Sequence, residues 1–117
     1  MTAGTPIRIP LACNLGAFSP AERERHASLL ARLGSEVVGT EELPDGYAFE
    51  FGSDPGLVAE VSEWVSLERA CCPFLKFQIE LAPEKGMLRL RLTGSPQVKE
   101  FLRAEFGKLL LPSRLRP

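Results

Sequence analysis

The strongest constraint on the fold is a strict alternation of apolar and polar side chains in two neighbouring segments, FLKFQIEL (74–81) and MLRLRL (87–92). A two-residue period places successive side chains on opposite faces of a β-strand. The intervening APEKG (82–86) is typical of a turn, so the two segments predict an antiparallel hairpin. One face of this hairpin is apolar, and the other carries Lys, Gln, Glu and Arg. Such a sheet needs a helical or second-sheet layer over its apolar face.

Three other segments have the period of amphipathic helices. Residues 19–34 and 95–107 each begin with a Ser-Pro pair and end in glycine, which are typical start and stop signals. We therefore expect Gly34 to end the first helix. Residues 54–71 predict another helix, which ends near Cys71 because the next residue precedes a proline and is driven out of the helical region.

The remaining periodic segments read as strands. Residues 7–15 alternate apolar and polar side chains, and Pro10 within them favours an edge position because proline cannot donate to a ladder. Residues 35–43 and 47–51 flank Pro-Asp-Gly (44–46), which predicts a second hairpin whose turn uses the conformational freedom of its glycine.

The expected element order is therefore β-α-β-β-α-β-β-α. Hairpins with one solvent-exposed face and helices with one apolar stripe predict an α+β fold, a two-layer sandwich with a mainly antiparallel sheet. The 117 residues suffice for one hydrophobic core, so we expect a single domain over residues 1–117. Residues 107–117, apolar and then basic, are expected to be a loosely packed tail.

Charge and composition argue against several classes of protein. Lys and Arg number 14 and Asp and Glu number 15, so no basic excess indicates a nucleic-acid partner. No apolar run reaches the ~18 residues of a membrane span, and the N-terminus does not have the pattern of a signal peptide. Three cysteines, an odd number, make no disulfide framework and predict a cytoplasmic protein with free thiols. The apolar KLLLP of the tail, or the helix before it, is a candidate homodimer surface.

The reactive side chains gather on faces predicted to be buried. On the helix over residues 54–71 an apolar stripe continues through Glu68 to Cys71 and Cys72. The residues of this stripe, which are expected to lie in the core, are Leu57, Val58, Val61, Trp64 and Val65. His26 shares its helical face with leucines, and Cys13 points inward from its strand. A carboxylate on an apolar face must find a partner or a metal, or raise its pKa.

Metal binding is the sharper interpretation of this set. Thiolate, imidazole and carboxylate together suit zinc, whereas thiolates alone suit copper(I) or mercury. We predict a small cytoplasmic protein that binds such an ion through Cys71 and Cys72, with Glu68 as a ligand or supporting base. Cys13 and His26 are the next candidate ligands. The role would be sequestration or sensing rather than turnover, with no catalytic residue and no organic cofactor.

Two alternatives stay open. The cysteines are equally compatible with a structural or interaction domain that buries them as small apolar groups. A thiol redox protein is the third interpretation, and the helix C-terminus counts against it because its partial negative charge raises a thiol pKa.

The segments LERACCPFLKFQIEL, LRLTGSPQVKEFL, ELPDGYAFEF and SPAERERHASLL together resemble a family of small uncharacterised bacterial proteins. That family has a Glu-x-x-Cys-Cys-x-Phe-x-x-Phe core, matched here by Glu68, Cys71, Cys72, Phe74 and Phe77. The resemblance covers roughly residues 7 to 106. Similar segments, often with Ser at the position of the proline, accompany heavy-metal resistance or metal-responsive regulators. The resemblance implies that Glu68 and the two cysteines act as a unit, with Cys13 as a third thiol.

Overall fold

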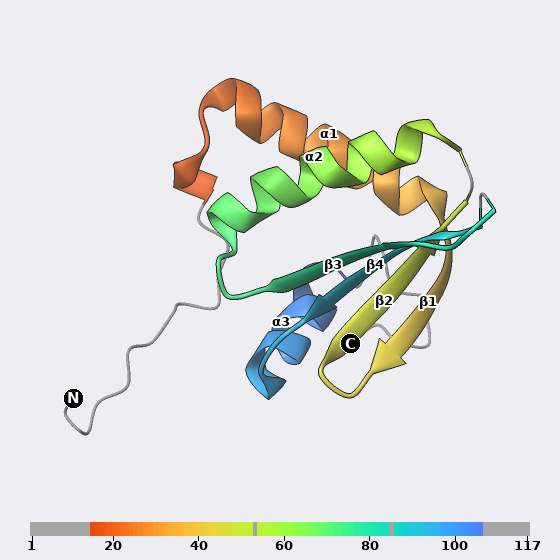
Figure 1. The fold of residues 1–117 in the computed structure, drawn as a ribbon. Coiled ribbons are helices and arrows are strands. Elements are labelled where there is room, and N and C mark those ends of the chain that lie inside the picture. Colours follow the sequence, from red (N-terminus) through yellow and green to blue (C-terminus); the bar gives the residue numbers. More distant parts are fainter. Residues whose placement is uncertain (1–14, 53, 85, 107–117) are drawn as a thin grey trace.

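A computed structural model describes residues 15–52, 54–84 and 86–106 of the chain. Within these ranges three α-helices and a four-stranded antiparallel sheet form an α+β fold, as predicted (Figure 1). The elements follow one another as η1 (Leu15–Ala17), α1 (Pro20–Glu36), β1 (Val37–Leu43), β2 (Gly46–Phe51), α2 (Gly56–Cys71), β3 (Lys76–Leu81), β4 (Leu88–Thr93) and α3 (Pro96–Phe106).

The sheet has the strand order β1-β2-β4-β3, and every neighbouring pair is antiparallel. The two hairpins predicted from the sequence are both present, β1 with β2 and β3 with β4. Their inner strands pair with each other, with Phe49 opposite Leu90, so the apolar faces of the two hairpins join into one. Among the described strands, β1 and β3 are the outer ones.

All three helices contact the apolar face of the sheet. Trp64 of α2 lines a small cavity with Phe51 and Leu90 of the sheet, and its ring lies 6.1 Å from that of Phe106 on α3. Figure 1 shows α1 and α2 side by side across the sheet. The opposite face carries the polar residues of the alternating strands, such as Arg89 opposite both Glu50 and Glu80. The predicted two-layer arrangement is thus observed.

The first helix begins as predicted and ends later. The side chain of Ser19 accepts a hydrogen bond from the backbone of Glu22, and the carboxylate of Glu22 accepts one from the backbone of Ser19, which completes a capping box. The expected stop at Gly34 is wrong, because α1 continues to Glu36. Gly34 does not take the positive φ of a C-terminal glycine cap, and an ion pair between Arg32 and Glu36 spans the last turn.

The predicted turn between β1 and β2 is present, but its glycine serves a different purpose. Pro44 and Asp45 make the turn, and Gly46 already belongs to β2 without a positive φ. A Cβ atom at Gly46 would lie 2.0 Å from the backbone oxygen of Leu92. Glycine is therefore needed here for the close approach of β2 to the end of β4.

One part of the predicted apolar face remains open. Phe77, Ile79 and Leu81 lie on the helix side of the sheet, opposite the buried leucines of β4, but Ile79 and Leu81 are exposed. Val58, placed on the buried stripe of its helix by periodicity, is exposed as well. The open area follows the seam between α2 and β3, where β3 is the outer strand.

Several expectations fall beyond the described ranges. The strand predicted over residues 7–15 lies outside the described residues except for Leu15, which belongs to the short 3₁₀ turn η1. The tail over residues 107–117 lies outside them too. In the part of the chain that the structure describes, no helix has the length and apolar character required to cross a bilayer.

Candidate metal centre

The site is built where α1 and α2 pack against each other. His26 lies in the second turn of α1 and is buried, as its place among leucines predicted. Its ring lies 5.2 Å from that of Phe18 and 6.3 Å from that of Trp64, measured between centroids. These aromatic rings hold the imidazole between the two helices.

Glu68, one turn before the end of α2, is fully buried. Its Oε1 lies 2.6 Å from Nε2 of His26, so a short hydrogen bond joins the two helices inside the core. The apolar stripe that ran through Glu68 thus brings the carboxylate to the only histidine of the chain. A buried carboxylate requires such a partner, because desolvation of an unpaired charge is costly.

Cys71 occupies the last position of α2, three residues after Glu68. Its thiol is a free, fully buried group and donates to the same Oε1 atom of Glu68 over 3.7 Å. The pKa of Cys71 is raised to about 12, mainly by burial of the thiol and secondly by the negative charge of Glu68. The thiol of the metal-free protein therefore keeps its proton at neutral pH and is a poor nucleophile.

Cys72 is buried as well, and its sulfur lies 3.5 Å from that of Cys71. The sulfur atoms of these two neighbouring residues therefore lie side by side, although adjacent cysteines usually point in different directions. The expectation that all thiols are free is wrong for Cys72, which is held in a disulfide, while Cys71 is free as expected. The other half of that disulfide is not among the described residues.

His26, Glu68 and Cys71 form a group that can hold a metal ion. One ligand atom from each lies within 4.8 Å of the other two. Tetrahedral zinc with N and O ligands at ~2.0–2.1 Å and S at ~2.3 Å separates its ligand atoms by about 3.3–3.6 Å. The 3.7 Å between sulfur and carboxylate lies just above this range, and the 2.6 Å between imidazole and carboxylate must open by less than an ångström.

Of the five predicted site residues, the structure brings four together. Glu68 and Cys71 contact each other, Cys72 lies beside Cys71, and His26 reaches them from the other helix. Cys13 lies outside the described residues. Sequence reasoning assigned Trp64 to the core alone and did not place it beside the site, because its spacing on α2 is also that of an ordinary core residue.

Comparisons of the chain with family models, with curated proteins and with solved structures found no match to any of them. The geometry described above therefore carries the functional argument.

Proposed function

We propose that the protein binds one zinc ion, or another thiophilic metal, through His26, Glu68 and Cys71, for sequestration or sensing. The observation that carries this proposal is the convergence of three buried side chains of ligand type from two helices, with their ligand atoms within 4.8 Å. His26 and Cys71 both contact the same carboxylate oxygen, Oε1 of Glu68.

The donor types favour zinc over softer ions. One nitrogen, one oxygen and one sulfur donor form a borderline set, whereas copper(I) and mercury prefer several thiolates. The position at the C-terminus of α2 supports a cation too, because the helix end carries partial negative charge.

Cys72 is the nearest candidate for a fourth ligand. Its sulfur lies 3.5 Å from that of Cys71, close to the roughly 3.8 Å between two thiolates on one tetrahedral zinc. Reduction of its disulfide would free this sulfur. A site with four protein ligands is closed, as in structural zinc sites, and leaves no position for substrate. The full burial of Glu68 and Cys71 agrees with storage or sensing rather than turnover.

Metal binding at this site must release a proton. Zinc takes the thiolate form of cysteine, and the pKa of Cys71 in the metal-free protein is raised to about 12. The apparent affinity should therefore rise with pH, about tenfold per unit for one released proton.

The test is a zinc titration of reduced, metal-free protein at pH 7, followed by the fluorescence of Trp64, the only tryptophan. Its ring lies 6.3 Å from that of His26, so a ligand on His26 should change its emission. We expect one zinc per chain. Glu68→Gln and Cys71→Ser should weaken binding by more than about 100-fold, beyond the 10–100-fold typical of outer-shell residues.

Glu63→Gln is the matched control, because Glu63 lies on the exposed side of the same helix. Cys72→Ser tests the fourth ligand and should retain binding at lower affinity.

The alternative function is a structural domain whose buried polar cluster is complete without metal. Its support is that His26 and Cys71 are already hydrogen-bonded to Glu68. Absence of zinc binding in the reduced, folded protein would favour that alternative.

A further inference from the structure

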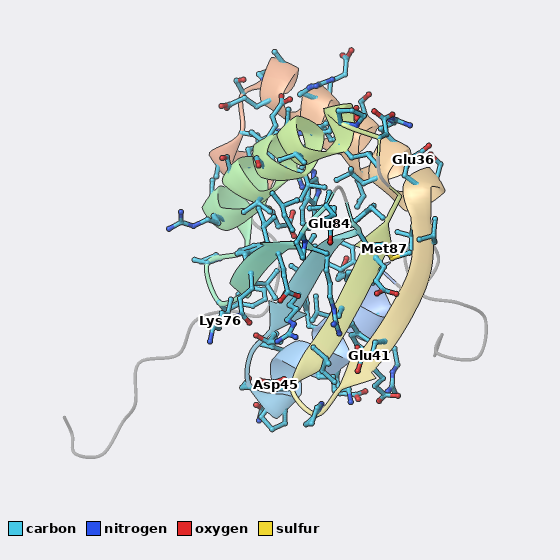
Figure 2. The ribbon with its side chains drawn as sticks, turned by 45° about the vertical axis from the view of Figure 1, so that its right-hand side comes forward. Glu36, Glu41, Asp45, Lys76, Glu84 and Met87 are labelled. Atoms are coloured by element: carbon cyan, nitrogen blue, oxygen red, sulfur yellow. The ribbon has the colours of Figure 1, made fainter. Side chains whose placement is uncertain are left out.

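Among the described residues, β3 pairs only with β4, so it is an outer strand of the sheet that they form. Figure 2 shows Lys76, at its start, and Glu41 of β1 at opposite edges of the sheet. An outer strand presents a row of backbone N–H and C=O groups that a further strand can pair with. β3 pairs in continuous register with β4, without a bulge, and contains no proline. It therefore lacks two of the features that prevent edge pairing, a bulge and a proline, and the charges that it does carry are of opposite sign.

The helix side of this edge carries exposed apolar side chains. Ile79 is 40% and Leu81 57% exposed, although both lie on the same face as the core. Two hollows follow the seam between α2 and β3. One, of about 340 Å³, has Val58 and Leu81 in its mainly apolar lining. The other, of about 440 Å³, is lined by Phe77 and Ile79 and also by the charged side chain of Arg69. Exposed apolar side chains beside each other at a sheet edge are typical of an interaction surface.

The sequence of β3, KFQIEL, is complementary to itself. Consider β3 paired antiparallel with β3 of a second copy, with the two Gln78 residues opposite each other. Lys76 of each copy then lies opposite Glu80 of the other copy, which gives two ion pairs. On the helix side, Phe77 lies opposite Ile79 of the second copy, also twice. Both ion pairs and both apolar pairs form in the same register, and each such cross-strand pair is stabilising.

Other registers lose this match. A shift by one residue places Phe77 opposite Glu80 and so sets apolar against polar or charged side chains across the whole strand. A shift by two keeps the faces but no longer places Lys76 opposite Glu80. The centred register is therefore the one that self-pairing of β3 should adopt.

The other outer strand, β1, lacks this property. Its sequence VVGTEEL contains two acidic residues and no basic one, so self-pairing would set like charges near each other. Its register with β2 also shifts between Val37 and Gly39, an irregularity that protects an edge.

We propose that two copies of this chain associate through β3, which pairs antiparallel with β3 of the second copy to give a continuous eight-stranded sheet. Charge complementarity within the strand and the exposed apolar side chains along the seam identify the occupant as a second copy. The interface predicted from the sequence, at the C-terminal helix or tail, is a different surface. The β3 dimer does not depend on the metal site, so either proposal can fail without the other.

Light scattering of the full chain, after size-exclusion chromatography, should give a mass near twice 12.9 kDa. Lys76→Glu and Glu80→Lys should each yield monomers at concentrations where the wild type is dimeric, because each sets like charges opposite one another twice. The double variant Lys76→Glu/Glu80→Lys reverses every pair and should restore the dimer. Circular dichroism checks that all three remain folded.

A covalent trap provides a second test. Gln78→Cys places two thiols opposite each other at the centre of the interface, and oxidation should link two chains. Val38→Cys, at an exposed position of β1, is the matched control and should not cross-link. A wild type that is monomeric at all concentrations overturns the proposal, as does a dimer that survives both single charge reversals. If a monomer still protects the outward amides of β3 from hydrogen exchange, a segment of the same chain such as residues 1–14 covers the edge instead.

Discussion

Two consecutive residues of α1, Arg25 and His26, each pair with a glutamate of α2, in very different surroundings. Arg25 meets Glu63 at 2.7 Å with side chains that are 50% and 44% exposed. His26 meets Glu68 at 2.6 Å with side chains that are 11% and 0% exposed. The distances are nearly equal, so the difference between the two pairs lies in their access to water.

The outer pair needs no further explanation. Water can replace either partner, and salt screens their attraction, so exposed pairs of this kind contribute little. The hydrogen bond from Arg25 lowers the pKa of the Glu63 carboxyl, as expected for a carboxylate beside a guanidinium. The inner pair is costly to bury, and an apolar pair of similar volume could replace it without loss of stability. Its presence, together with the thiol of Cys71, is therefore the stronger indication of function.

The largest effect should follow from breaking the inner pair. His26→Ala leaves the buried carboxylate of Glu68 without its imidazole partner and should lower the free energy of unfolding by about 3–5 kcal/mol. Urea denaturation followed by circular dichroism measures this loss. The double variant His26→Leu/Glu68→Leu removes both polar groups and should recover most of the stability. Equal losses in the single and double variants would mean that pairing is not what matters at this position.

An intermediate effect should appear at alkaline pH in the metal-free protein. The pKa of Cys71 is about 12 in the folded chain, against 9.0 for an ordinary thiol. Between these values the unfolded chain loses the thiol proton and the folded chain keeps it. The free energy of unfolding should then fall as pH rises, by up to about 1.4 kcal/mol per unit.

Because other groups titrate in the same range, the quantity to compare is the difference between the wild type and Cys71→Ser. That variant should lack the part of the pH dependence that arises above about pH 9. Parallel curves for the two proteins would show that Cys71 has an ordinary pKa.

The smallest effect should follow from breaking the outer pair. Arg25→Ala should lower Tm by only about 3 °C or less, because solvent replaces the guanidinium. The change should shrink further in 1 M salt, where screening removes most of the interaction. Differential scanning calorimetry of Arg25→Ala and His26→Ala side by side measures the contrast. A loss in Arg25→Ala as large as that in His26→Ala would remove the distinction between the two pairs.

Much of the fold was predictable, because its signals are local. Two-residue alternation predicted the hairpins, and the capping residues predicted where α1 begins. The end of α1 was not predictable from Gly34, because the start of β1 and the ion pair of Arg32 with Glu36 determine it. Alternation also cannot tell which strand lies at the edge of a sheet, so the exposure of Ile79 and Leu81 was missed.

The candidate site was predictable only in part, because local sequence patterns encode contacts within one helix but not contacts between helices. Helical spacing joins Glu68 to Cys71 along one face of α2, and that contact is observed. The contact of His26 with Glu68 joins residues 42 positions apart, and it depends on how α1 packs on α2. No local pattern encodes that packing. The sequence could therefore identify both side chains as unusual without showing that they meet.

The central claim is that His26, Glu68 and Cys71 together bind a metal ion. X-ray absorption at the zinc edge tests this claim most directly. Reduced protein loaded with one equivalent of zinc should show sulfur at ~2.3 Å and nitrogen or oxygen at ~2.0–2.1 Å. Cys71→Ser should reduce the sulfur scattering, with any remainder coming from Cys72, and Glu63→Gln should leave the spectrum unchanged. A zinc shell of oxygen and nitrogen alone in the wild type, or a spectrum that Cys71→Ser does not alter, would contradict the claim.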